Sequence, residues 1–241
     1  MRRRRRIGAG PLHTLRSAAS LRRMRVTFVR HAASEWSGKP ILCGHTDIPL
    51  SAVGERQCDA LDTRLAGRTF DALWSSPLVR ARTTASAIGD AIGHAVVTDP
   101  RLSELYLGTL EGVRFADLPQ GPGTFRDRWQ RNPGTVRFPK GETMREVASR
   151  TWTVLEELYD RHPKGHVLVV SHMFAISAAL CRVLQVRVGR FRTFGVDLAS
   201  LTTIQMDGDG FRLLMLNDTG HLTAEDLGPR GKLPVLPERS F

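Results

Sequence analysis

Short apolar runs recur along the chain at intervals that leave room for a helix between them. Three of them read as strands buried on both faces, because they are continuously apolar and rich in β-branched residues. They cover residues 24–30, 70–74 and 166–171. The segment HAVVTDP predicts a further short strand, and residues 200–206 and 211–216 predict a hairpin around DGDG.

Four segments between and after these runs predict helices. They cover residues 52–66, 77–92, 142–162 and 173–184. Ser51 is a suitable N-cap for the first, and Pro77 suits the first turn of the second. Alternating strands and helices with continuously apolar strands favour a mostly parallel sheet. We therefore expect one α/β domain of three layers, with helices on both faces of a central sheet.

This domain is expected to span residues 24–222, with a cap insertion at about 113–141. The insertion is rich in Gly, Pro and Arg, which predicts short helices and loops. Residues 1–23 are expected to form a basic, disordered extension, and residues 223–241 a C-terminal tail.

The net charge of +11 is concentrated at the N-terminus. Residues 1–25 hold nine arginines and no acid, so the rest of the chain carries only +2. A basic tail alone is weak support for a nucleic-acid groove, and no nucleic-acid partner is expected. The tail reads as an organelle-targeting presequence, a secretory leader, a basic arm or translated upstream sequence. We favour the last reading, with Met24 as the start.

Three widely spaced cysteines, Cys43, Cys58 and Cys181, favour free thiols in a reducing compartment. We therefore expect a cytoplasmic protein, although organelle targeting by the Arg-rich N-terminus stays open. No apolar run reaches the roughly 20 residues that span a bilayer, so no membrane span is predicted. A homodimer also stays open.

Cations and imidazoles follow the expected strands. Arg30 and His31 end the first strand, Arg80 lies one turn into the helix after the second, and His172 ends the strand HVLVVS. Each alone is more simply a solvated or structural residue. In an open α/β sheet, however, the ligand crevice lies beyond the carboxyl ends of the strands. Four such groups at one edge need a compensating anion, and guanidinium forks suit a phosphoryl group.

Seven segments carry a resemblance to a known family. In chain order they are VTFVRHAASEW, GHTDIPLSAVGERQ, SSPLVRARTTA, RLSELYLGTLEG, GETMREV, LVVSH and LNDTGHL. Together they resemble the histidine phosphatase superfamily, with its phosphoglycerate-mutase-like fold, and its phosphatase branch in particular.

The resemblance implies a metal-independent phosphomonoester hydrolase with a phosphohistidine intermediate. His31 would take the phosphoryl group onto its ring, which splits one displacement into two. Arg30, Arg80 and His172 would hold the phosphoryl oxygens. Glu104 would protonate the leaving oxygen and later deprotonate the attacking water.

Other residues of the same motifs complete the expected site. Glu111, in the motif of Glu104, is our second choice for the acid. Ser37, Cys43 and Gly44 are expected on the substrate-binding side. The resemblance implies no metal and no cofactor.

Departures from the mutase pattern favour a hydrolase. Ser37 stands where mutases carry Asn, Cys43 where they carry Thr, and Met173-Phe174 where they carry Gly-Asn. Fewer polar contacts would weaken the hold on a bisphosphate. A mutase dependent on 2,3-bisphosphoglycerate is the alternative, and a non-catalytic phosphate-binding module is the alternative of another class. The expected partner is a small-molecule phosphomonoester, with sugar phosphates and alpha-ribazole phosphate among those left open.

Overall fold

The computed structural model describes residues 22–227. Its six-stranded sheet has the order β3-β2-β4-β1-β5-β6. The strands are β1 (Arg23–Arg30), β2 (Ala72–Ser75), β3 (Val96–Thr98), β4 (His166–Ser171), β5 (Leu201–Asp207) and β6 (Gly210–Asp218). The first four are parallel to one another, and β5 runs antiparallel to both β1 and β6. The predicted mostly parallel sheet with a terminal hairpin is confirmed.

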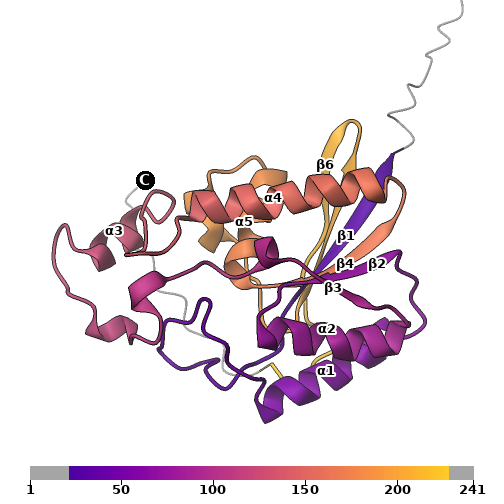
Figure 1. Cartoon of the computed structure of the whole chain (residues 1–241), viewed down its shortest axis with the longest axis horizontal. Helices are drawn as coiled ribbons and strands as arrows, with labels where there is room; N and C mark the ends of the chain where they lie inside the picture. The colour runs from indigo at the N-terminus through magenta and orange to yellow at the C-terminus, as the bar shows by residue number, and fades with distance from the viewer. Residues whose placement is uncertain (1–21, 228–241) are drawn as a thin grey trace, which may run out of the picture.

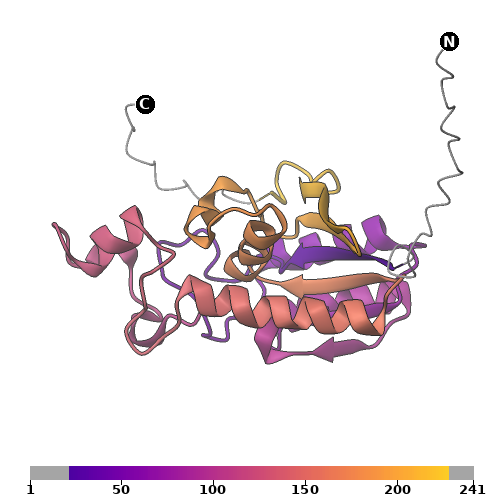
Figure 2. The same cartoon turned by 90° about the horizontal axis from the view of Figure 1, so that it is seen from above.

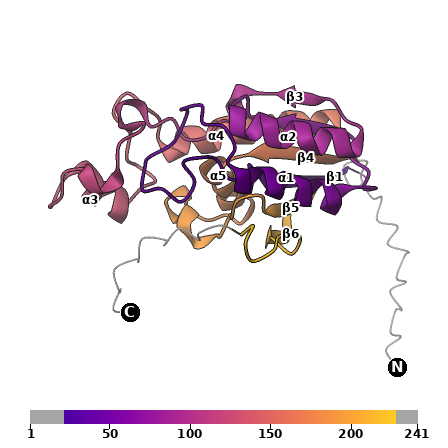
Figure 3. The ribbon, with the colours of Figure 1, turned by 90° about the horizontal axis from the view of Figure 1, so that it is seen from below.

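Five α-helices complete the described part of the chain. They are α1 (Ala52–Leu65), α2 (Val79–Ile92), α3 (Phe125–Arg131), α4 (Met144–Arg161) and α5 (Met173–Val183). Helices α1 and α2 lie side by side on one face of the sheet (Figure 3), and α4 and α5 cover the other (Figure 2). The predicted three layers are therefore present.

Successive side chains along a strand point to opposite faces of the sheet, so the core has one part on each face. Phe28 and Val169 join a cluster with α4 and α5, whereas Val29 and Val170 join a cluster with α1 and α2. All four side chains are fully buried. Burial on both faces explains why these strands are continuously apolar in the sequence.

The register of the parallel strands aligns their carboxyl ends. Arg30 pairs with Ser171, and Ser75 pairs with Val170 on the other side of β4. The residues that follow these strands, His31, Ser76 and His172, therefore emerge at one edge of the sheet. Figure 1 shows the segment with α3 beyond this edge, away from α1 and α2.

Two predicted elements differ from the structure. β2 begins at Ala72 rather than residue 70, because the Asp71 carboxylate accepts a hydrogen bond from the His166 backbone N–H at 2.6 Å and so serves as a strand-end anchor. Pro77 is outside α2 rather than in its first turn. The Ser76 hydroxyl accepts the Leu78 N–H at 3.2 Å, and Leu78 is extended, so helical geometry begins at Val79.

The predicted cap at about 113–141 consists of α3, the short 3₁₀ helix η4 (Phe115–Asp117) and loops. Its buried residues, among them Trp129 and Phe138, pack against Met144 of α4 and Ala178 of α5. The cap is thereby attached to the helical layer on one side of the strand ends.

Residues just outside both predicted domain limits make contacts with the folded domain. Arg23, placed in the N-terminal extension, begins β1 and its N–H donates to the Pro163 carbonyl at 2.6 Å. Asp226, placed in the C-terminal tail, accepts from Arg56 at 2.9 Å. Arg22, also placed in the extension, donates to Asp160 at 2.8 Å, and the predicted disorder of residues 1–21 lies outside the described residues. Within the described residues, no helix has the length and apolar character to cross a bilayer.

Candidate active site

His31 follows β1 directly, and its backbone N–H donates to the Ser171 carbonyl at 2.9 Å. Its buried ring places Nδ1 2.8 Å from the carbonyl oxygen of Ala32. Because a carbonyl only accepts, Nδ1 carries the hydrogen and Nε2 presents its lone pair. Burial lowers the pKa of His31 well below 6.5, and the charges of Arg80 and Arg30 lower it further. The ring is therefore a neutral base at pH 7.

Arg80, one turn into α2, lies directly against this ring. Its Nε donates to His31 Nε2 at 3.3 Å, while Nη1 and Nη2 donate to the carbonyls of Thr46 and Gly44 at 3.0 and 2.6 Å. The side chain is buried. Two backbone carbonyls thus hold the guanidinium in place beside the histidine.

Arg30 and His172 contribute polar atoms with no partner among residues 22–227. Arg30 donates through Nη1 to the Val196 carbonyl at 2.6 Å, but its buried Nε has no partner there. His172 Nε2 lies 2.8 Å from the Ser76 hydroxyl, and its Nδ1 is also buried and unpartnered within that range. The His172 and His31 ring centroids are 5.0 Å apart. Buried polar groups normally have partners, so these atoms mark a place for a ligand.

The charges around this place would attract an anion. Burial lowers the pKa of His172 well below 6.5, and Arg80 and His31 add to that effect. Burial also lowers the pKa of Arg30, whereas Glu104 and Asp197 oppose that shift. An anion between two buried guanidiniums would offset their desolvation and mutual repulsion.

Glu104 brings a carboxyl group to the same centre from the loop after β3. It is 5% exposed, and Oε1 accepts the N–H groups of Leu105 and Phe174 at 2.9 and 3.1 Å. Burial raises its pKa above 4.5, against the opposing effects of these N–H groups and of Arg80 and Arg30. A carboxyl with a raised pKa is suited to donating a proton near neutral pH.

Comparison with known proteins shows which family the chain belongs to. The family model of the histidine phosphatase superfamily (branch 1) matches residues 26–219. The chain belongs to this superfamily. Phosphoserine phosphatase 1 of Hydrogenobacter thermophilus is 35% identical over 200 residues, which cover 83% of this chain and 94% of that protein.

Relatives of this histidine phosphatase include both reaction types expected of the family. A probable phosphoglycerate mutase of Yersinia enterocolitica is 30% identical over 204 residues, covering 83% of this chain and 95% of that protein. A solved mycobacterial glucosyl-3-phosphoglycerate phosphatase is 28% identical with a TM-score of 0.72, covering 82% of this chain and 100% of that one. The phosphatases among the relatives confirm the expected class, a phosphoric monoester hydrolase acting on a small organic phosphate.

Glu111, the second choice for the acid, has a different place in this histidine phosphatase. Its carboxylate accepts the backbone N–H groups of Gly44, His45 and Leu107, at 2.9, 2.8 and 3.1 Å. Burial would raise the pKa of Glu111, but these hydrogen bonds and that from Thr46 outweigh it and lower the pKa below 4.5. A carboxylate held ionised in this way is a poor acid, and it anchors the loop that holds Arg80.

The three residues expected on the substrate side lie in supporting positions. Ser37 Oγ accepts the Ser34 N–H at 2.9 Å and so closes a turn after β1. Gly44 supplies a carbonyl to Arg80, and a Cβ there would overlap Glu111 Oε1 and the Leu105 carbonyl. Cys43 is half-buried, which raises the pKa of its thiol. Their role in binding substrate stays a prediction.

Two supporting side chains, those of Thr84 and Ser76, were not predicted as site residues from the sequence. Thr84 Oγ accepts the Ala32 N–H at 3.0 Å and donates to the Arg80 carbonyl at 2.7 Å. Ser76 faces His172, as described above. Thr84 lies one turn after Arg80 on the same helix and Ser76 directly follows β2, so position relative to the strand ends was the available signal.

The aromatic residues of the cap pack against one another. Trp129 has its ring centroid 4.8 Å from Phe138, 6.0 Å from Phe174 and 6.0 Å from Phe191. Phe125 lies 4.8 Å from Phe138. These side chains therefore form a packed cluster in the core of the cap.

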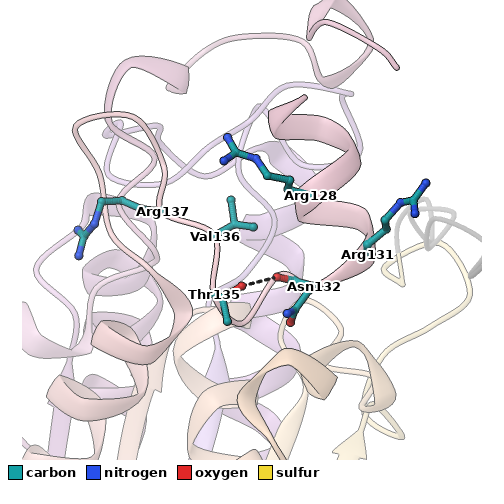
Figure 4. A pocket seen from close by; sticks show the side chains of 6 residues that line it. All are labelled: Arg128, Arg131, Asn132, Thr135, Val136 and Arg137. Carbon is teal, nitrogen blue, oxygen red and sulfur yellow. Dashed lines mark hydrogen bonds between the residues drawn. The ribbon is translucent and has the colours of Figure 1, made fainter. Parts of the chain in front are cut away.

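A hollow of about 520 Å³ lies in the cap, and Figure 4 shows the side chains around it. It is lined by Arg128, Arg131, Asn132, Thr135, Val136 and Arg137. The three guanidiniums point apart in Figure 4. Arg131 pairs with Asp127 and Arg137 with Glu146, both at 2.6 Å. The hollow thus lacks the convergent buried groups that mark the site at the strand ends.

Proposed function

We propose that this histidine phosphatase hydrolyses a small phosphomonoester without a metal ion, through a phosphohistidine on Nε2 of His31. The observation that carries the proposal is the hydrogen bond from Nδ1 to the Ala32 carbonyl, because it leaves Nε2 unprotonated in a neutral ring, with its lone pair directed at Arg80 Nε 3.3 Å away. Arg80 Nε beside that nitrogen, and the unpartnered buried Arg30 Nε and His172 Nδ1, supply donors for the phosphoryl oxygens.

In the first step, His31 Nε2 attacks phosphorus and the bond from phosphorus to the ester oxygen breaks. Glu104 transfers its proton to the leaving oxygen, so a neutral alcohol departs. Arg30, Arg80 and His172 stabilise the charge that develops on the other oxygens.

In the second step, the Glu104 carboxylate takes a proton from water as that water attacks phosphorus. The phosphorus–nitrogen bond breaks, inorganic phosphate leaves, and His31 and Glu104 return to their starting protonation states. Within residues 22–227, no group of three His, Cys, Asp or Glu side chains is placed to bind a metal, and this mechanism uses none.

The test is release of phosphate from an aryl phosphate in the presence of EDTA, with wild type compared to His31→Ala. We expect wild type to be active and His31→Ala to lose activity by at least about 10³-fold, since the nucleophile is absent. Equal activity in both proteins would show that another group attacks phosphorus.

Phe174 supports hydrolysis over mutase activity. Its N–H contacts Glu104 and its ring packs against Trp129 and Phe191, so the position occupied by Asn in mutases is part of the cap core here. Assays of 3-phosphoglycerate isomerisation with and without 2,3-bisphosphoglycerate should show no efficient interconversion.

We take phosphoserine as the first substrate to assay. Support comes from the phosphoserine phosphatase that is 35% identical over most of its length. Values of kcat/KM for phosphoserine, 3-phosphoglycerate, glucosyl-3-phosphoglycerate and alpha-ribazole phosphate would rank the candidates.

Cytoplasmic location and a homodimer remain part of the proposal. Cys43, Cys58 and Cys181 are free thiols in the structure, which agrees with a reducing compartment. Sedimentation of the full chain would give its oligomeric state.

A further inference from the structure

Arg150, on the inner side of α4, has a partner for every N–H of its guanidinium, and three of these partners are backbone carbonyls of residues 101–104. Nη1 donates to the carbonyls of Arg101 and Ser103, both at 2.7 Å, and Nη2 donates to the carbonyl of Glu104 at 2.8 Å. The remaining two N–H groups bind the Glu142 carboxylate at 2.8 and 2.9 Å. One side chain therefore holds three carbonyls of a four-residue stretch that ends in the proposed acid.

Glu142 extends the attachment beyond Glu104. Its Oε2 accepts the backbone N–H of Tyr106 at 3.0 Å, and its own N–H donates to the Tyr106 carbonyl at 2.9 Å. The backbone is thus held on both sides of Glu104 by Glu142, just before α4, and Arg150, in the second turn of α4. Glu142 belongs to the GETMREV motif, which the proposed chemistry leaves without a role, and Arg150 lies three residues after that motif.

The arrangement differs from the ion pairs on the surface of the same helix. The Arg150 and Glu142 side chains are 16% and 23% exposed, whereas Arg137 and Glu146 are 57% and 46% exposed. A planar fork with five donors can reach several backbone oxygens and a carboxylate together, which a lysine ammonium cannot.

We propose that Arg150 and Glu142 are positioning residues that keep the Glu104 carboxyl in reach of both the leaving oxygen and the attacking water. The inference rests on the proposed acid–base role of Glu104. Under this proposal, neither Arg150 nor Glu142 contacts the substrate. Their effect is to fix the backbone from which Glu104 projects, and proton transfer depends closely on that placement.

The test compares two aryl esters that differ in their need for an acid. Phenyl phosphate requires protonation of its leaving oxygen, whereas 2,4-dinitrophenyl phosphate releases a stable anion unaided. The ratio kcat/KM reports the steps through release of the phenol, so it isolates the protonation. Arg150→Lys and Glu142→Gln would be assayed with both esters. Glu104→Gln serves as the reference, and Arg145→Lys, exposed on the same helix, as the control.

We expect Arg150→Lys to lower kcat/KM for phenyl phosphate by at least about tenfold, which is part of the roughly 10²- to 10⁴-fold that a general acid contributes. The value for dinitrophenyl phosphate should fall by no more than about twofold to threefold, because that ester needs no acid. Glu142→Gln should show the same selectivity and Arg145→Lys none. A merely structural role would lower both values equally by reducing the folded fraction, and that result would overturn the inference, as would no loss with either ester.

The Glu104→Gln reference distinguishes failure of the positioning inference from failure of the proposed function. If Glu104→Gln loses activity with phenyl phosphate alone while Arg150→Lys does not, the acid stands and the positioning inference is overturned. If Glu104→Gln affects both esters equally or neither, the proposed acid role itself is wrong.

Discussion

At the scale of single residues, the reactivity of His31 depends on one backbone carbonyl. The Ala32 oxygen takes the hydrogen of Nδ1 and leaves Nε2 facing Arg80. Burial and two nearby guanidiniums lower the pKa of this ring, while burial raises the pKa of Glu104. The two shifts have opposite directions, and each favours the neutral form that the first step needs.

These directions predict the pH dependence of kcat/KM. As pH falls through the lowered pKa of His31, the ring gains a proton and loses its lone pair, so the acid limb lies well below pH 6.5. As pH rises through the raised pKa of Glu104, the acid loses its proton, so an alkaline limb lies above pH 4.5. We expect a bell-shaped profile, with the acid limb due to His31 and the alkaline limb due to Glu104.

The measurement is a pH series of kcat/KM for wild type and Glu104→Gln with phenyl phosphate. Ionisation of the ester itself gives a limb in both proteins, so only a limb that disappears in Glu104→Gln belongs to the carboxyl. An unchanged profile in that variant would contradict the assignment.

At the scale of elements, α1 supports the loop that follows His31. Ser51, its N-cap, donates its backbone N–H to the Ala33 carbonyl at 2.9 Å, and Gln57 accepts the Ala33 N–H at 2.7 Å. The first turn of α1 approaches so closely that a Cβ on Gly54 would overlap the Ala33 carbonyl oxygen. This helix therefore fixes the backbone two residues beyond His31, the proposed nucleophile.

This close approach predicts that Gly54→Ala destabilises the protein. In a free helix the substitution would add about 1 kcal/mol of stability, but here the added methyl group displaces the loop, and overpacking costs typically about 1–3 kcal/mol. Urea unfolding should show the loss, with a fall in kcat because the loop carries His31. Asp59→Ala, exposed on the same helix, should change stability by no more than about 0.5 kcal/mol. A Gly54→Ala protein as stable as wild type would contradict the packing argument.

The elements that the sequence predicted well are those whose own residues determine them. Strand 166–171 matches β4 because its centre is a continuous run of valine and leucine, which favours a buried strand, and Gly165 precedes it. The predicted start of β2 and the predicted place of Pro77 in a helix were wrong, because contacts made in the folded chain decide both. Asp71 accepts the backbone N–H of His166, and Ser76 accepts that of Leu78 in the turn after β2. Local pattern does not contain such contacts.

At the scale of the whole molecule, topology explains which part of the site was predictable. Parallel strands align their carboxyl ends, so the convergence of Arg30, His31 and His172 followed from the alternation of elements. The surroundings of Glu104 could not be predicted in this way, because they combine the loop after β3 with the first turn of α5 and the second turn of α4. Only the resemblance to a family pointed to that carboxyl.

The same convergence leaves the folded protein with buried donors that an anion would satisfy, so inorganic phosphate should stabilise it. A ligand that binds only the folded state at 100 times its Kd adds about 2.7 kcal/mol. For a domain of this size that is a rise in Tm of roughly 5–10 °C. Thermal unfolding in phosphate, compared with chloride at equal ionic strength, measures the effect. Arg30→Gln should reduce the shift, because it removes the unpartnered Nε, whereas Arg145→Gln should retain it. Equal Tm values in phosphate and chloride would show that the strand ends hold no phosphate, and the proposed hydrolysis would then lack its product site.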